Sequence, residues 1–133
     1  MGQTDLALGA LRQIALASGE DLDTSIDFYR DALRLPFLGR FEPPGIAFFD
    51  AQGTRLLLSS DAPNARLYFD VDDISAAGKE LTKRGIAFKG DPIMVHRDDA
   101  GQFGEPITEE WMQFFDDPAG NLIALVERRK PQA

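Results

Sequence analysis

The sequence predicts an α+β fold: two βαβββ modules whose strands form a half-barrel sheet, with one helix behind each module. Three observations predict it. The chain has 133 residues, 44% of them hydrophobic and 27% charged, which suits one soluble globular domain. Strand-like and helix-like apolar patterns occur in the same order in both halves of the chain. Finally, a stretch of sequence in the first half of the chain recurs in the second half.

The first module opens with a strand predicted over residues 11–17. A helix follows, and Asp21 or Asp23 can accept hydrogen bonds from its first amides. Its apolar face recurs at helical spacing, in Leu22, Ile26, Tyr29 and Leu33. Pro36 ends this helix. Three short strands separated by turn-forming residues then predict an antiparallel meander, at 36–41, 46–50 and 54–60.

The pattern restarts in the second half. Residues 65–71 predict a strand, and Asp72-Asp73 begins a second helix that ends before Gly85. The apolar face of this helix is formed by Ile74, Ala77 and Leu81. Further short apolar runs complete the module, at 85–90, 92–97, 111–116 and 121–127.

The repeat is visible in the letters themselves. Residues 48–58 align with 114–125, and alignment on Gly53 and Gly120 matches Leu57 with Ala124. A repeat of this length indicates two similar units that share one core. The predicted domain covers 9–128, divided into module one at 9–60, a linker at 61–65 and module two at 66–128, with flexible ends at 1–8 and 129–133.

Composition narrows the possible functions. The chain has no cysteine, which excludes a disulfide framework, a cysteine-ligated metal and a cysteine nucleophile. Its net charge of −8 makes nucleic acid a poor partner. No apolar run is long enough to cross a membrane, and the first residues lack the basic start of a signal peptide. We therefore expect a cytoplasmic protein with no membrane partner.

Three stretches together resemble the vicinal oxygen chelate (VOC) superfamily. They read DLDTSIDFYRDALRL, VDDISAAGKELTKRGI and FFDDPAGNLIAL. That superfamily contains glyoxalase I, methylmalonyl-CoA epimerase, extradiol dioxygenases, and the bleomycin and fosfomycin resistance proteins. The resemblance covers nearly all of 9–128 and implies curled modules that enclose a metal or ligand cleft, often completed by dimerisation. It identifies the superfamily and no single activity.

The resemblance also implies where a metal would bind. Metal-dependent members usually place a His or Gln on the first strand of each module and a Glu on the last. The first-strand positions fall at Gln13, with Ile14 as the alternative, and at Arg66. The last-strand positions fall at Leu57 and Ala124. Leu57 and Ala124 carry no donor atom, and the fixed positive charge of Arg66 repels a cation. We therefore expect no divalent metal and predict no other cofactor.

Strand alternation predicts which side chains face the interior of the cup. The predicted ligand-binding residues are Gln13, Arg55, Arg66, Tyr68, Met112 and Phe114. Arg66 is a candidate anchor for an anion or carbonyl, the alternative being an ion pair with Asp70 or another carboxylate. For Arg55 the alternative is a salt bridge at the rim.

Two further residues are candidates for proton transfer. His96 is the only histidine, and imidazole is a common general base near neutral pH. Its alternative role is that of an exposed residue at a strand end. Glu110 shares the predicted inward face of Met112 and Phe114, whereas the neighbouring Trp111 is expected to anchor the core on the helix side.

Two functional hypotheses follow. The first is a metal-free, glyoxalase-like or epimerase-like protein acting on or binding a small oxygenated metabolite; as an enzyme it would be a lyase or isomerase with His96, Glu110 and Arg66 as catalytic residues. The alternative is a drug-sequestering protein of the bleomycin-resistance type. Both predict a small-molecule ligand. Both also predict a homodimer, because the cup of one chain is open along a sheet edge.

Overall fold

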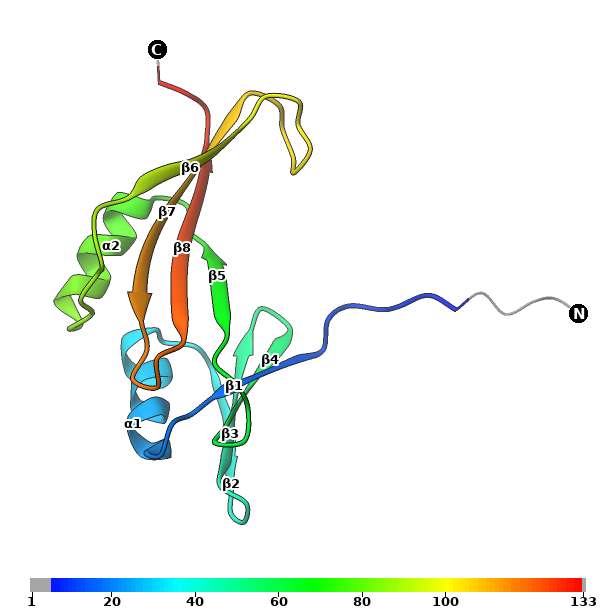
Figure 1. The fold of residues 1–133 in the computed structure, drawn as a ribbon, viewed down its shortest axis with the longest axis vertical. Helices are drawn as coiled ribbons and strands as arrows, with labels where there is room; N and C mark the ends of the chain where they lie inside the picture. The colour runs from blue at the N-terminus through cyan, green and yellow to red at the C-terminus, as the bar shows by residue number, and fades with distance from the viewer. Residues whose placement is uncertain (1–5, 133) are drawn as a thin grey trace, which may run out of the picture.

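The computed structural model describes residues 6–132 as two four-stranded sheets with a helix against each (Figure 1). Residues 1–5 and 133, which belong to the ends predicted to be flexible, lie outside the described residues. The strands of the first sheet are β1 (Gln13–Ala17), β2 (Phe37–Phe41), β3 (Ile46–Ala51) and β4 (Thr54–Ser59). Those of the second are β5 (Arg66–Asp70), β6 (Ile93–Asp98), β7 (Thr108–Asp116) and β8 (Leu122–Arg129).

The helices begin where the sequence predicts. In α1 (Leu22–Asp27), the carboxylate of Asp21 accepts from the Thr24 amide at 3.2 Å. This helix continues into a π-helical turn, η1 (Phe28–Ala32). In α2 (Ile74–Lys83), Asp73 accepts from the Ala76 amide at 3.0 Å, and Glu127 accepts from the Ile74 amide at 2.7 Å.

The two sheets have the same topology, which confirms the predicted βαβββ repeat. Their strand orders are β1-β4-β3-β2 and β5-β8-β7-β6, and in each the first strand lies parallel to the last. The register also confirms the alignment of the modules. Phe48 pairs with Leu57 as Phe114 pairs with Ala124, so Leu57 and Ala124 occupy equivalent positions.

Two details differ from the predicted elements. The eight strands form two separate sheets, and among residues 6–132 no ladder joins β1 to β5. The apolar run at 85–90 is not a strand. Its only sheet-like pairing is an isolated bridge from Phe88 to Phe115, because Gly85 (φ 93°) and the Gly90-Asp91-Pro92 turn leave too short a segment for a ladder.

The core lies between the helices and the sheet faces that they cover. Its largest fully buried side chains are Tyr29, Phe49 and Phe115. Phe28 on η1 packs against Phe115 of the second sheet, with ring centroids 6.2 Å apart, so the first helical segment contacts the core of both units. Within residues 6–132, neither helix has the length and apolar character needed to span a membrane.

Candidate functional site

A cleft separates the first sheet from β5, and we call it the inter-unit cleft. Its volume is about 770 Å³, within the range of roughly 300–1,000 Å³ common for small-molecule sites. It is lined by Leu11, Ile14, Leu35, Ala51, Gln52, Thr54 and Leu56 from the first unit and by Arg66, Leu67, Tyr68, Phe69 and Asp70 from the second. The cleft can therefore hold a ligand between the units.

Strand β5 supplies the ionisable groups of the cleft. Arg66, Tyr68 and Asp70 alternate along the strand, so their side chains leave the same face of the sheet. All three are exposed. Within residues 6–132 none of the three side chains makes a hydrogen bond or ion pair, so Arg66 and Asp70 do not neutralise each other here. A guanidinium, a phenol and a carboxylate are thus free to contact a ligand.

Apolar side chains form much of the remaining wall. Ile14 and Leu56 are cross-strand partners on β1 and β4, and Leu35 follows η1. Thr54 is a polar exception, but its hydroxyl is already engaged with the carbonyl oxygen of Leu11 at 2.9 Å. An apolar wall with few polar groups is typical of sites that bind organic molecules.

The positions expected for metal ligands do not assemble a donor set. Gln13 and Arg66 occupy equivalent positions in the two units. Gln13 pairs with Arg55 and Arg66 pairs with Leu122, and these partners lie two residues before the equivalent Leu57 and Ala124. Ile14 belongs to the opposite face of β1. In the described part of the chain, no three His, Cys, Asp or Glu side chains gather in a way that could hold a metal ion. The hydrocarbon side chains of Leu57 and Ala124 and the guanidinium of Arg66 do not fit the metal of the superfamily's metal-dependent members.

Gln13 and Arg55 lie together on the first sheet. The Nε of Arg55 donates to Oε1 of Gln13 at 3.1 Å, and its guanidinium carbon is 5.8 Å from the centroid of the Phe48 ring. With Leu38 and Phe41, Arg55 and Phe48 line a hollow of about 360 Å³. The rim salt bridge considered for Arg55 is not formed among residues 6–132.

His96 and Glu110 are brought together on the second sheet, since they are directly paired on β6 and β7. Glu110 is also ion-paired, because its Oε2 accepts from Nη1 of Arg128 at 2.9 Å. The His96 ring packs edge-on against Phe103, with centroids 5.6 Å apart. The pair therefore exists, but its carboxylate is committed to an arginine.

Asp98 completes this charged group, and the sequence patterns gave no sign of it. It is 2% exposed and accepts from the amides of Phe103 at 2.9 Å and Gln102 at 2.8 Å, and from Nη2 of Arg128 at 3.1 Å. The Phe103 amide first, and then the Gln102 amide and the Arg128 guanidinium, lower the pKa of Asp98 to about 2. These bonds close the loop between β6 and β7.

The structure does not bring Arg66 together with His96. The register places His96 level with Arg128, six residues beyond the Leu122 partner of Arg66 and three strands away. At about 3.3 Å per residue and 4.8 Å per strand, their Cα atoms lie roughly 20 Å or more apart. Met112 and Phe114 lie between the two groups on β7, half-buried on the same face as Tyr68 and Asp70.

Trp111 packs on the core, as expected. It is half-buried, its Nε1 donates to Glu109 at 2.9 Å, and the Arg129 guanidinium lies 4.3 Å from its ring centroid. The cleft residues that the sequence did not single out are mainly Thr54, Gln52 and Leu35. The β3–β4 hairpin and the connection from η1 to β2 bring them beside β5, and periodicity carries no signal for such contacts.

Comparison with known proteins gives a family and a fold. The family model described as "Glyoxalase/Bleomycin resistance protein/Dioxygenase superfamily" matches residues 11–125. No curated protein matches the chain. Among solved structures, lactoylglutathione lyase from Agrobacterium tumefaciens is 24% identical with a TM-score of 0.67, over 91% of this chain and 95% of that one.

Two further structures have similar scores. The antibiotic binding protein TnmS3 from Streptomyces sp. CB03234 is 21% identical with a TM-score of 0.66, over 96% of this chain and 100% of that one. The integron cassette protein VCH_CASS1 from V. cholerae is 20% identical with a TM-score of 0.70, over 93% and 98%. At these identities the similarity shows the fold alone.

Proposed function

We propose that this chain, which belongs to the glyoxalase/bleomycin resistance protein/dioxygenase superfamily, binds a small oxygen-bearing organic molecule in the inter-unit cleft without a metal ion. The observation that carries the proposal is the position of Arg66. It stands where a metal ligand would stand in a metal-dependent member, it lines the cleft, and its guanidinium has no partner among residues 6–132. A fixed cation there takes over the attraction for substrate oxygens that a metal would otherwise provide.

The three ionisable groups suggest how such a ligand is oriented. A guanidinium presents parallel N–H donors that match a carboxylate or two adjacent oxygens. Tyr68 lies about 7 Å farther along β5 and Asp70 about 13 Å, at the usual rise of a strand. The ligand is therefore expected to place an acidic or carbonyl group at Arg66 and, if it is long enough, a hydroxyl or amine near Asp70.

Binding is favoured over turnover by the placement of the proton-transfer candidates. Neither His96 nor Glu110 lines the cleft, and Glu110 is held by Arg128. A ligand anchored at Arg66 would therefore be out of their reach. Sequestration of a drug-like molecule, as in the bleomycin-resistance proteins, fits this arrangement.

Catalysis of the lyase or isomerase type is the second candidate, and the carboxylate of Asp70 in the cleft favours it. Asp70 shares the face of Arg66 and is exposed. If the chain moves a proton on a ligand bound at Arg66, Asp70 is the carboxylate base that lines the same cleft. The Tyr68 hydroxyl lies between Arg66 and Asp70 along β5. Asp70→Asn would then abolish turnover and leave binding in place.

Isothermal titration with benzoate, and with benzamide as its uncharged match, tests the proposed function. Benzoate should bind more tightly than benzamide, and Arg66→Gln should weaken benzoate binding by about 10-fold to 100-fold, the value of a charge-assisted hydrogen bond. Lys83→Gln removes the same charge from the exposed end of α2 and should change nothing. Equal affinity of Arg66→Gln and the unchanged chain for benzoate, or no binding of benzoate, would refute the proposal.

A further inference from the structure

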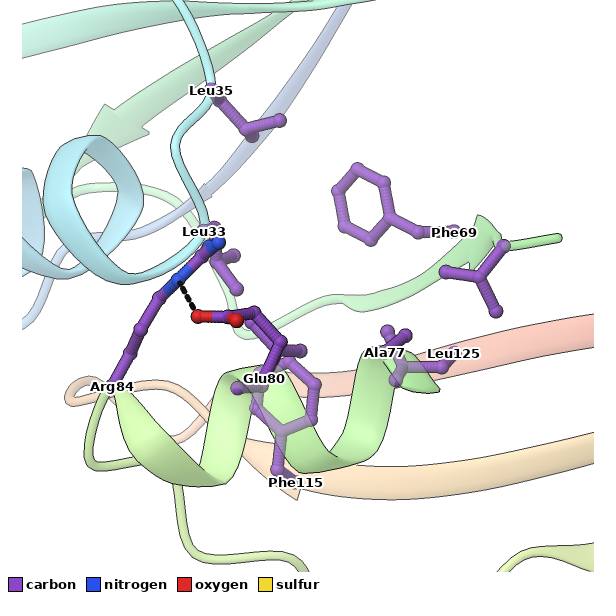
Figure 2. A pocket seen from close by; sticks show the side chains of 10 residues that line it. Leu33, Leu35, Phe69, Ala77, Glu80, Arg84, Phe115 and Leu125 are labelled. Carbon is purple, nitrogen blue, oxygen red and sulfur yellow. Dashed lines mark hydrogen bonds and ion pairs between the residues drawn. The ribbon is translucent and has the colours of Figure 1, made fainter. Parts of the chain in front are cut away.

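A second cavity lies behind the inter-unit cleft, between α2, the second sheet and the segment that follows η1 (Figure 2). We call it the apolar chamber, and its volume is about 250 Å³. Its wall is built from hydrocarbon side chains such as Leu33, Leu81, Phe115 and Leu125. Among residues 6–132, Glu80 and Arg84 are the only charged residues that line it.

Both charged residues are engaged with protein partners. Nε of Arg84 donates to Glu80 at 3.2 Å, and Nη1 donates to the Ala32 carbonyl at 2.8 Å. Figure 2 shows this ion pair beside the hydrocarbon lining. The chamber therefore favours an apolar occupant, because a polar one would find few free partners and would lose its hydration.

The chamber and the cleft share two lining side chains. Leu35 and Phe69 line both cavities, and Figure 2 shows them extending toward each other from opposite sides. Both are half-buried. Alternation along β5 explains the division, because Tyr68 faces the polar part of the cleft while Phe69 faces the helix side. The two cavities therefore meet at Leu35 and Phe69.

We propose that the cleft and the apolar chamber form one site for an amphipathic monocarboxylate. This inference rests on the proposed function. The carboxylate binds at Arg66, and the apolar tail passes between Leu35 and Phe69 into the chamber. The volume suits this occupant, since a cavity of about 150 Å³ is enough to hold benzene. Arg66 and Phe69 are about 10 Å apart along β5, which sets the shortest tail that reaches the chamber.

The test is isothermal titration with straight-chain carboxylates from hexanoate to dodecanoate, below their micellar concentrations, with the alcohols of equal length as matched probes. Acids too short to reach Phe69 should bind with nearly constant affinity. Beyond that length, each added methylene should strengthen binding about fourfold until the chamber is full. The alcohols should bind more weakly at every length.

Ala77→Phe places a ring in the chamber from α2 and should remove the dependence on chain length. Its benzoate affinity should stay unchanged, which also shows that the cleft is folded. Ala76→Phe adds the same ring at an exposed position that does not line the chamber and should behave like the unchanged chain. If Ala77→Phe does not fold, Ala77→Leu gives a smaller filling at the same place.

Each outcome separates this inference from the proposed function. If benzoate binding depends on Arg66 but alkanoate affinity does not rise with length, the single site is refuted and the proposed function stands. If acids and alcohols bind equally and Ala77→Phe weakens both, the chamber acts without Arg66, and the single site is again refuted. If neither benzoate nor any alkanoate binds, both proposals fail.

Discussion

Tyr29 on η1 donates a 2.6 Å hydrogen bond to Oδ2 of Asp117, which lies 88 positions later in the turn between β7 and β8. Both side chains are buried. Burial and the adjacent carboxylate raise the pKa of Tyr29 far above its usual range, so its phenol remains a donor. Oδ1 of Asp117 accepts from the amides of Ala119 and Asn121. These hydrogen bonds therefore connect η1 of the first unit to the turn between β7 and β8 of the second unit.

Asn121 extends this connection to two more segments. Its Nδ2 donates to the carbonyl of Ala17 at 2.7 Å, and its Oδ1 accepts from the amide of Ala65 at 2.7 Å. The turn thus holds the end of β1, the residues before β5 and η1 at one point. The Phe-Tyr and Asp-Pro-Ala-Gly-Asn segments therefore join the two units and lie outside the cleft.

Tyr29→Phe should lower the free energy of unfolding by about 1–2 kcal/mol, because it leaves one buried carboxylate oxygen short of a donor. Urea unfolding measures the difference. Tyr68→Phe removes an exposed phenol without a partner among the described residues and should change stability by less than about 0.5 kcal/mol. Equal free energies of unfolding for Tyr29→Phe and the unchanged chain would show that this hydrogen bond does not stabilise the contact between the two units.

The fold could be predicted because its signals are local and repeated. Apolar residues at helical spacing predicted α1 and α2. The recurring Phe-Phe-Asp sequence predicted that Leu57 and Ala124 are equivalent, and the register confirms this. The separation of β1 from β5 could not be predicted. It depends on how the two units pack through Tyr29 and Asn121, and those contacts join residues 88 and 104 positions apart.

The candidate site was predictable only in part, for a similar reason. Alternation correctly placed Arg66 and Tyr68 on one face, and both line the cleft. The catalytic hypothesis combined Arg66 with His96, the only histidine, but neither its type nor strand alternation gives a distance along a sheet, and the register places His96 far from Arg66. The buried Asp98 carried no pattern, because its partners are loop amides and an arginine 30 positions later.

Metal analysis by mass spectrometry should find far less than one equivalent per chain. Added nickel, zinc, manganese or iron should leave the melting temperature unchanged, because Leu57, Ala124 and Arg66 supply no donor atom for a cation. A stoichiometric metal would contradict this prediction. His96→Ala and Glu110→Gln would then show whether those side chains hold it.

The bonds of Asp98 should make part of the stability depend on pH. Its pKa is lowered from 3.8 to about 2 in the folded chain, so the carboxylate stabilises the fold above about pH 4 and loses that effect as the pH falls toward 2. Asp98→Asn should therefore be less stable than the unchanged chain near neutral pH, and the difference should shrink near pH 2. Urea unfolding at both pH values measures it.

Asp61→Asn is the matched control, since Asp61 is exposed and its side chain has no partner among residues 6–132. Its effect on stability should be small at both pH values. A deficit for Asp98→Asn that is as large near pH 2 as at neutral pH would show that the charge of Asp98 is not what closes the loop.

We expect the chain to form a homodimer through the open edge of its second sheet. β6 ends that sheet, and Ile93, Met94 and Val95 are consecutive apolar residues, 53%, 47% and 41% exposed. Such an edge is a site for association with another chain.

Sedimentation equilibrium should give a dimer, and Val95→Glu should shift it toward monomer because a charge would be buried. Ala87→Glu places the same charge at an exposed position outside β6 and should leave the dimer intact. A chain that sediments as a monomer at every concentration, or a dimer that Val95→Glu does not weaken, would contradict the assignment of this edge.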